Sequence, residues 1–295
     1  MNPPTVSVII LTYNRAELVC KTIRSVLKQT FQDFEIVVID DGSDDDTADA
    51  IAKLNASKII FEAYSHSGHI AKLRNAGIAK SRGKYLTFLD SDDLWKESHL
   101  QSQVNVLNST ITAGYVFSDV EVFNQERIIL SNIYQEKRGR LFDRNLFNEF
   151  ISGDLLLLPA TNLMFRRNCL ETAGTFNEQF RGGDYDFLSR LVLHYHGALS
   201  DGPPAQIRRH EGEQSSATLE IENLREVLFC IRRFRKEGNL EKAAYKRLAL
   251  QYHYKIALAF RKQKKHFRAL REYVICFAIK PNMGGIVKRI WKNLV

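Results

Sequence analysis

The sequence predicts an α/β fold in which helices flank a mainly parallel sheet, followed by a helical extension. Short apolar runs rich in β-branched residues alternate with helical stretches through the first 123 residues. Strands separated by helices of about ten to fifteen residues form right-handed crossovers and therefore parallel sheets. From about residue 219 onward only helical patterns remain. We expect two domains, residues 1–218 and residues 219–295.

The individual elements follow from the spacing of their apolar residues. Buried strands are predicted at residues 6–11, 34–39, 58–61, 85–89, 115–123, 162–165 and 205–210. Helices are predicted at residues 18–27, 47–54, 70–80, 184–195, 219–236, 240–262 and 266–279, with a short helix that ends at Gly174. Residues 124–158 have no periodic pattern that assigns them to either class.

Composition excludes several classes of protein. A hydrophobic content of 44% rules out a disordered or fibrous chain. No apolar run approaches the roughly 18–20 residues that span a membrane, and the first four residues, Met-Asn-Pro-Pro, do not resemble a secretory signal. The four cysteines lie far apart, without CxxC spacing. We therefore expect neither a disulfide framework nor a cysteine-built zinc site, and a cytoplasmic location.

The net charge of +8 is distributed unevenly along the chain. Residues 220–295 contain 19 Lys+Arg and 6 Asp+Glu, whereas residues 1–219 contain 23 and 28. The two parts therefore have opposite net charge and are treated as separate functional units. The last ten residues interleave apolar side chains with Lys288, Arg289 and Lys292. This amphipathic pattern suits a membrane interface, and a solvated face of a supporting hairpin is the alternative.

Three polar clusters follow predicted strands at the point where each strand ends. They are Thr12-Tyr13-Asn14-Arg15, Asp40-Asp41-Gly42-Ser43 and Asp90-Ser91-Asp92-Asp93. Ligands of open parallel sheets bind beyond the carboxyl ends of the strands. Like charges at about 4 Å repel by about 4 kcal/mol at an effective dielectric of 20, so the third cluster favours a bound Mg²⁺ or Mn²⁺. A solvated turn that caps the following helix is the alternative.

These clusters, together with the stretch from Gly68 to Ile78, resemble glycosyltransferase family 2, whose fold is of the GT-A type. The resemblance covers roughly residues 5–212 and rests on four motifs in the order of the family. It implies that Thr12, Tyr13, Asp41, Arg74 and Asp90 bind the nucleotide. A carboxylate such as Asp41 accepts the imide N–H of uracil, and a tyrosine ring stacks on a base.

The resemblance also implies a metal site and a catalytic base. Asp92 corresponds to the metal-binding acid of the DxD motif, and His210 to a histidine near the diphosphate or metal. Asp184 corresponds to the general base, although Gly183 occupies the position where relatives most often have Glu. Asp186 is a competing candidate, but its place in a first helical turn favours a structural role. Histidine pairs elsewhere lack further ligands and are interpreted as ordinary residues.

The resemblance implies an inverting, metal-dependent glycosyltransferase, most simply with a UDP-sugar donor. It would serve cell-envelope or polysaccharide synthesis, on a glycan or a lipid-linked acceptor, with peripheral contact between residues 220–295 and an anionic membrane at its cytoplasmic face. A nucleotidyltransferase is a second candidate, although the first turn lacks the glycine-rich phosphate loop of that class. A third candidate is a basic, non-enzymatic module that binds nucleic acid or membrane. We prefer the enzyme, and on that interpretation we expect no nucleic acid among the partners.

Overall fold

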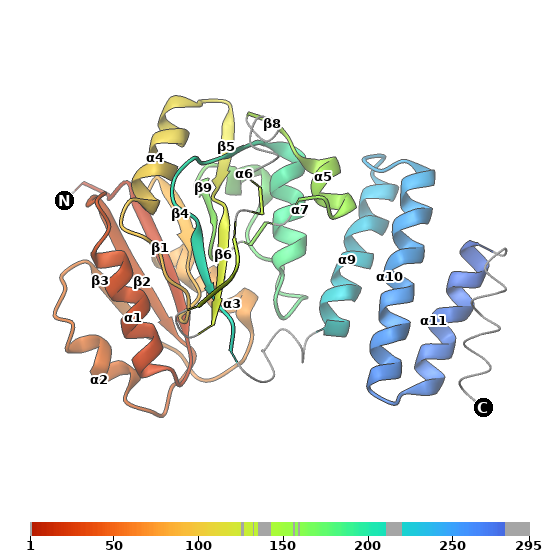
Figure 1. Ribbon diagram of the computed structural model, residues 1–295, viewed down its shortest axis with the longest axis horizontal. Helices are drawn as coiled ribbons and strands as arrows, with labels where there is room; N and C mark the ends of the chain where they lie inside the picture. Colours follow the sequence, from red (N-terminus) through yellow and green to blue (C-terminus); the bar gives the residue numbers. More distant parts are fainter. Residues whose placement is uncertain are drawn as a thin grey trace. The chain divides into compact units, whose positions relative to one another are not determined.

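A sheet of eight strands runs through the first part of the chain, in the order β3-β2-β1-β4-β9-β5-β10-β8 (Figure 1). The computed structural model describes residues 2–124, 127–131, 133–134, 143–155, 157–158, 160–210 and 220–280. The strands of this sheet are β1 (Val6–Thr12), β2 (Phe34–Asp40), β3 (Ile59–Ala63), β4 (Tyr85–Phe88), β5 (Ala113–Phe117), β8 (Arg144–Asn145), β9 (Leu163–Arg166) and β10 (His196–Leu199). Among them β8 and β9 pair antiparallel and the rest pair parallel. The expectation of a mainly parallel sheet is confirmed.

Helices cover both faces of this sheet, as the alternation of strand and helix signals predicts. The helices of the first part are α1 (Ala16–Leu27), α2 (Thr47–Ala52), α3 (Ile70–Lys80), α4 (His99–Ser109), α5 (Phe147–Ser152), α6 (Cys169–Ala173) and α7 (Asp184–His194). Val8 and Ile10 of β1 belong to a buried cluster that includes apolar residues of α1 and α4. Ile9, which lies between them in β1, packs against Gly77 of α3 on the other face of the sheet, because successive side chains of a strand alternate.

A second, smaller sheet corrects one predicted strand. Residues 115–123 are not continuous: β5 ends at Phe117, and β6 (Val120–Asn124) joins β11 (Ala205–Arg208) and β7 (Arg127–Leu130) in a three-stranded sheet. Asp119 lies at the break. Its buried carboxylate accepts hydrogen bonds from the backbone N–H groups of Val120 and Tyr134, at 2.9 and 3.3 Å. The Asp119 carbonyl in turn accepts the Ala205 backbone N–H at 2.8 Å, so the break lies where the chain passes from the first sheet to the second.

The chain divides into two compact units, residues 1–211 and residues 212–295. The expected boundary between residues 218 and 219 falls in a stretch, 211–219, that lies outside the described residues. The second unit contains α9 (Glu220–Lys236), α10 (Lys242–Lys262) and α11 (His266–Ile279), which lie side by side (Figure 1). In its interior, His253 Nδ1 lies 2.6 Å from Glu272 Oε2 and Arg232 lies 3.3 Å from His253 Nε2, so side chains tie the three helices together.

Among the described residues, no helix has the length and apolar content needed to cross a bilayer. The expected amphipathic segment at residues 286–295 lies outside those residues.

Candidate active site

Two parallel strand pairings bring the three polar clusters to one edge of the large sheet. Thr12 at the end of β1 is paired with Asp40 at the end of β2. On the other side of β1, Ile9 is paired with Phe88, so Asp90 and the acids that follow β4 lie at the same edge. Asp41 donates its backbone N–H to the Thr12 carbonyl at 2.9 Å and extends this register. The expected convergence of the clusters is therefore present.

The turn after β1 is fixed by bonds to the turn after β2. Asn14 has a φ of 49°, a conformation that asparagine tolerates better than most residues. Its backbone N–H donates to Ser43 Oγ at 2.8 Å, and its side-chain amide both donates to and accepts from Asp44. The two flanking side chains, Tyr13 and Arg15, are thereby held at the carboxyl edge of the sheet.

Tyr13 presents an aromatic face that is partly filled by a histidine. The half-exposed Tyr13 ring stacks on His66, with 4.1 Å between ring centroids and 20° between planes. Thr12 is buried beside it, and its hydroxyl has no hydrogen-bond partner among the described residues. A flat, partly exposed aromatic ring of this kind can stack on another planar ring.

Asp41 is buried and organises the loop that carries His66. Its Oδ1 accepts hydrogen bonds from the backbone N–H and hydroxyl of Ser67, at 2.9 and 3.0 Å. Its Oδ2 accepts from the Gly68 N–H at 2.8 Å and lies 3.0 Å from His66 Nδ1. A carboxylate has about four acceptor positions. Ser67 and Gly68 therefore use most of the acceptor positions of Asp41, and His66 Nδ1 also lies 3.0 Å from the Asp41 carbonyl. A base would reach the carboxylate only by displacing one of these neighbours.

Asp92 is the shared partner of two side chains from distant parts of the chain. Its Oδ2 lies 2.8 Å from Arg15 Nη1 and 2.8 Å from His210 Nε2. Arg15 follows β1, whereas His210 follows β11. The structure thus brings Asp92 and His210 together, as the sequence interpretation requires, and adds Arg15 as a counter-ion that the sequence analysis did not single out.

Asp93 has a structural task, because it anchors the end of β11. The buried carboxylate accepts from the Arg208 backbone N–H at 2.8 Å and from the Thr161 hydroxyl at 2.6 Å. The Asp93 carbonyl accepts from the Thr22 hydroxyl of α1. Burial, together with the charges of Asp90 and Asp92, raises the pKa of Asp93 well above its usual range. These bonds position His210, which lies two residues after Arg208.

Asp90 keeps contact with solvent at the surface of the site, while protein surrounds the carboxyl on its other sides. This desolvation, with the nearby charge of Asp92, raises the pKa of Asp90 to about 6, and the charges of Arg74 and Arg15 oppose the rise. Two carboxyl groups and two guanidinium groups therefore interact electrostatically in this part of the site.

Arg74 and Asp184, two of the expected site residues, form an ion pair with each other. The Arg74 side chain is 5% exposed, whereas that of Asp184 is 46% exposed. The guanidinium lies over the rings of Phe88 and Phe176, at 5.8 and 5.0 Å. Arg74 therefore holds the carboxylate from the protein side and leaves its other side to solvent.

The loop before Asp184 is fastened to α3. The side-chain amide of Asn75 donates to the Phe176 carbonyl and to Glu178 Oε1, both at 2.9 Å. Arg181 donates through Nε to the Gly68 carbonyl at 2.6 Å. Gly183 precedes α7 with a φ of 74°, a left-handed conformation that favours glycine over Glu.

Asp186, the competing candidate for the base, is fully buried and its carboxylate binds Arg190 at 2.8 Å. It points away from solvent, unlike Asp184.

The donor set at Asp92 fits a divalent cation that completes its coordination from a substrate. A carboxylate oxygen and an imidazole nitrogen are suitable ligands for Mn²⁺, and Mg²⁺ is bound through one or two carboxylates plus substrate phosphates. Among the described residues, no group of three or more His, Cys, Asp or Glu side chains is arranged to hold a metal ion.

Three residues that contact the site were not predicted as site residues from the sequence: Arg15, His66 and Arg208. The Arg208 guanidinium donates to the Asp92 carbonyl at 2.9 Å. Arg15 and Asp92 are 77 positions apart, and Arg208 and Asp92 are 116 apart. No local pattern signals such contacts, although Arg15 adjoins the Thr-Tyr-Asn motif.

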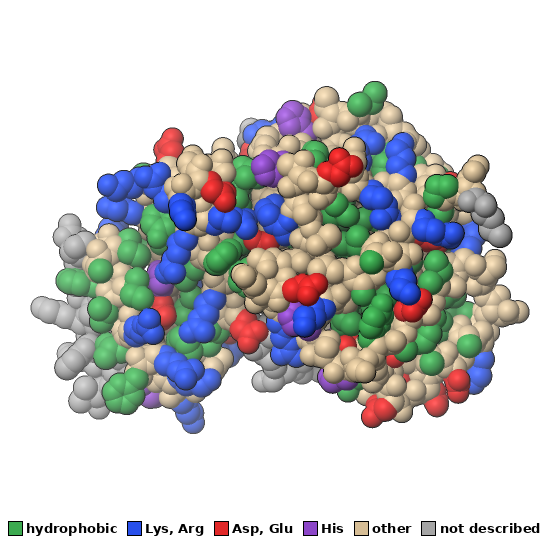
Figure 2. Space-filling view, turned by 180° about the vertical axis from the view of Figure 1, so that it is seen from behind, with side chains coloured by type: hydrophobic (Ala, Val, Ile, Leu, Met, Phe, Trp, Pro, Cys, Tyr) green, Lys and Arg blue, Asp and Glu red, His purple; other side chains and the backbone are tan. Residues whose placement is uncertain are grey.

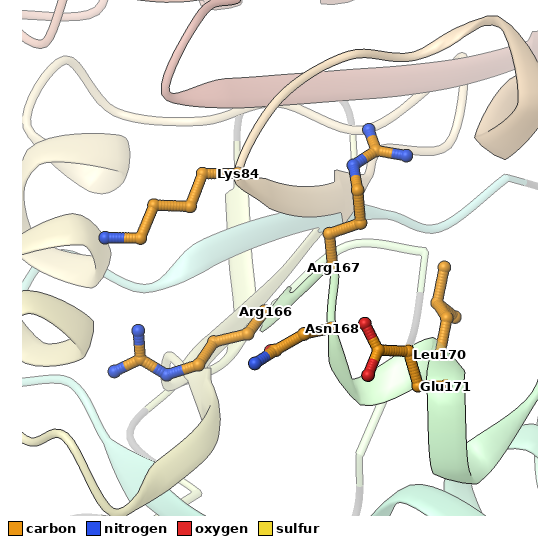
Figure 3. Close-up of a pocket in the computed structure, with 6 residues that line it drawn as sticks. All are labelled: Lys84, Arg166, Arg167, Asn168, Leu170 and Glu171. Carbon is orange, nitrogen blue, oxygen red and sulfur yellow. The ribbon is translucent and has the colours of Figure 1, made fainter.

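A separate cavity of about 610 Å³ lies at the opposite end of β4 and is lined by Lys84, Arg166, Arg167, Asn168, Leu170 and Glu171 (Figure 3). Figure 3 shows Arg166 and Arg167 pointing in different directions. Arg166 donates to the carbonyls of Leu107, Thr110 and Ala113, and Arg167 donates to that of Gly83. These arginines are engaged in holding the fold, so the cavity is not the expected donor site.

Comparison with known proteins identifies the family. The family model described as glycosyl transferase family 2 matches residues 7–171. The chain belongs to this family. One relative, the Escherichia coli protein WfaP, is named a UDP-Glc:alpha-D-GlcNAc-diphosphoundecaprenol beta-1,3-glucosyltransferase. It is 32% identical over 129 residues, which cover 44% of this chain and 50% of the relative. The chain spans about a quarter to just over half of the length of the curated relatives it matches.

Solved structures agree on the fold. S. aureus TarS, residues 1–349 in complex with UDP-GlcNAc, matches with a TM-score of 0.70 and 21% identity, over 92% of this chain and 81% of TarS. The mannosyltransferase PcManGT of Pyrobaculum calidifontis, in complex with GDP-Man and Mn²⁺, matches with a TM-score of 0.61 and 17% identity, over 100% of this chain and 82% of that one. The expected GT-A type of α/β fold is confirmed.

Proposed function

We propose that the protein is a metal-dependent inverting glycosyltransferase that moves a sugar from a nucleoside-diphosphate sugar to an acceptor hydroxyl. The observation that carries this proposal is the position of Arg74. Its guanidinium pairs with Asp184, and its charge also acts on the Asp90 carboxyl. One buried arginine therefore links the proposed base to the acids at the donor edge of the sheet, as a transfer between donor and acceptor requires.

Asp184 is the proposed general base. Its carboxylate is half exposed and fixed from behind by Arg74, so an acceptor hydroxyl can approach it from solvent. The base takes the hydroxyl proton while the oxygen attacks the anomeric carbon from the face opposite the departing diphosphate. The configuration at that carbon is then inverted, without a covalent intermediate. A well-placed base contributes on the order of 10²–10⁴ in rate.

UDP is the proposed nucleotide of the donor. TarS, which has the same fold, is described in complex with UDP-GlcNAc, and WfaP is named for a UDP-Glc donor. In this chain Tyr13 supplies a stacking face, and Asp41 supplies the acceptor for a uracil imide N–H, which takes the place of the His66 donor. Thr12, Arg74 and Asp90 complete the proposed nucleotide-binding set.

Asp92 and His210 are the proposed protein ligands of Mn²⁺ or Mg²⁺. PcManGT, which has the same fold, is described with Mn²⁺. When bound, such an ion neutralises the charge that develops on the diphosphate. Arg15 lies beside the same Asp92 oxygen and supplies a further positive charge at the diphosphate position.

A glycan or a lipid-linked sugar is the proposed acceptor, because the name of the relative WfaP includes a diphosphoundecaprenol acceptor. We place the reaction in cell-envelope or polysaccharide synthesis, at the cytoplasmic face of a membrane. The surplus of 19 Lys+Arg over 6 Asp+Glu in residues 220–295 suits peripheral contact with anionic lipid.

A donor screen tests this function. UDP-, GDP- and ADP-sugars are incubated with the protein, an acceptor mixture, and either Mn²⁺ or EDTA, and the release of nucleoside diphosphate is measured. We expect release from UDP-sugars in Mn²⁺ only. In a parallel incubation with nucleoside triphosphates, release of inorganic pyrophosphate, with no nucleoside diphosphate released from the sugar donors, would instead indicate a nucleotidyltransferase.

A further inference from the structure

The last described helix, α11, presents apolar side chains to solvent on one face. Phe267 is 91% exposed, Val274 is 60% exposed and Phe277 is 44% exposed. Their spacing of seven and three residues places them in one stripe along the helix. Tyr273 and Cys276 lie on the other side and are buried. The exposed stripe is therefore a second apolar face, which packing within the three helices does not use.

A dense set of cations surrounds the start of this stripe. From Lys242 through Arg271 the chain has ten Lys+Arg and no Asp or Glu. The side chains at the turn between α10 and α11 and on the first turns of α11 are exposed: Lys262, Lys264, Lys265, Arg268 and Arg271. Figure 2 shows Lys and Arg side chains interspersed with hydrophobic ones over the C-terminal helices. An almost fully exposed phenylalanine thus lies among positive charges.

An anionic lipid surface complements both properties of this face. Its headgroups attract Lys and Arg by about 1 kcal/mol each, and its interface accepts aromatic and aliphatic side chains. Nucleic acid also attracts the cations, but a phosphate backbone leaves the stripe from Phe267 to Phe277 in contact with water. Exposed apolar area of this kind marks an interaction site. The combination of charge and apolar stripe favours lipid over nucleic acid.

We propose that the outer face of α11, together with the α10–α11 turn, docks on an anionic membrane, with Phe267 inserted between the headgroups. The proposal deepens the membrane contact of the proposed function and rests on it. It places the contact on α11, whereas the sequence pattern points to residues 286–295. The acceptor would then be met at the surface to which the enzyme is bound.

Vesicle flotation of the full-length protein tests this surface. Phosphatidylcholine vesicles with and without phosphatidylglycerol are used at low salt. We expect flotation only with phosphatidylglycerol, and a decrease of binding by about tenfold for Phe267→Ser, since burial of a phenylalanine side chain contributes about 1.5–3 kcal/mol. Ile111→Ser is the matched control, because Ile111 is 86% exposed in the first unit. This control should float like the wild type.

The charges are tested in the same way. Lys264→Glu with Lys265→Glu should weaken binding by about tenfold or more, at about 1 kcal/mol for each lost attraction. Lys28→Glu with Lys53→Glu makes the same change of charge at exposed helix ends of the first unit and should have little effect.

Three outcomes would overturn the proposal. Equal flotation of wild type and Phe267→Ser moves the membrane contact away from α11. Absence of flotation, with retention of DNA on a native gel, assigns the face to nucleic acid. Absence of both, in a protein that still binds UDP, refutes the surface and leaves the transferase function standing. A wild-type protein that does not bind UDP would instead refute the transferase function, whatever the flotation result.

Discussion

The guanidinium of Arg74 and the carboxylate of Asp184 form an ion pair in which the arginine is buried and the aspartate faces solvent. The two residues come from α3 and α7, and Asn75 and Arg181 fasten these segments together through Phe176 and Gly68. Contacts from α3 and from the loop before it therefore help to hold the proposed base, in addition to its own helix. This relationship makes the proposed base and its support separately testable.

Asp184→Asn should abolish transfer while the affinity for UDP is retained. The amide cannot take a proton, and a base acts mainly in the transition state. We expect kcat to fall by on the order of 10²–10⁴, the usual contribution of a general base. Steady-state kinetics and calorimetry on the same preparation measure the two quantities. A kcat within about tenfold of wild type would exclude Asp184 as the base.

Arg74→Lys should lower kcat by about tenfold, because lysine is a point charge without the planar fork that fixes the carboxylate. The readout that separates positioning from a general effect is the double variant. On an Asp184→Asn background, Arg74→Lys should change kcat little, since the group that it positions is already inactive. Additive losses in the double variant would show that Arg74 does not act through Asp184 and would leave it only the proposed nucleotide-binding role.

Asp41→Ala should reduce the preference for UDP over GDP and ADP. The wild type should bind UDP most tightly, because the Asp41 carboxylate offers an acceptor to the uracil imide. Loss of such a buried hydrogen bond costs about 1–3 kcal/mol, or roughly tenfold or more in affinity. Calorimetric titration with the three diphosphates measures the difference. Equal affinities in the wild type would argue against uracil recognition.

His99 should make the first unit less stable at mildly acidic pH. Burial lowers the pKa of His99 to about 4, from 6.5, and its Nδ1 lies 3.2 Å from the Pro203 carbonyl. Between these values the unfolded chain binds the proton and the folded chain does not, so the free energy of unfolding falls as pH falls. The loss approaches about 3 kcal/mol by pH 4.

His99→Gln is the matching variant for this effect. Urea unfolding, followed through Trp95, which stacks on His99, compares wild type and variant at pH 7.5 and pH 5. The variant should be less stable at pH 7.5 but should lose less stability on acidification. An identical pH dependence in both proteins would refute the assignment.

Local patterns predicted the elements whose periodicity is long, and they failed where a contact decides the structure. Helix α3 has its expected limits, residues 70–80, and the three C-terminal helices lie within two residues of theirs. Helix α4 was missed, and strand β10 was missed because its sequence, His-Gly-Ala-Leu, does not form an apolar run like those of the other short strands. Its Gly197 packs against Tyr115, whose ring leaves no room for a side chain there.

In the candidate site, too, local features could be predicted from the sequence and long-range contacts could not. The clusters at the strand ends were predictable, because the carboxyl ends of parallel strands meet at one edge. The Arg15 and His210 contacts to Asp92, and the occupation of Asp41 by residues 66–68, were not predictable, since they join residues 25 to 118 positions apart. Asp93 has the same sequence context as Asp92 and yet serves to anchor β11.

Calorimetric titration of UDP in the presence of Mn²⁺ and in the presence of EDTA tests the central claim, a metal-assisted nucleotide-sugar site, most directly. The account predicts that Mn²⁺ raises the affinity of the wild type for UDP by about tenfold or more and that Asp92→Asn removes this gain. Asp186→Asn, at a carboxylate that binds Arg190, is the control and should keep it. A wild-type protein that binds no UDP under either condition would contradict the account.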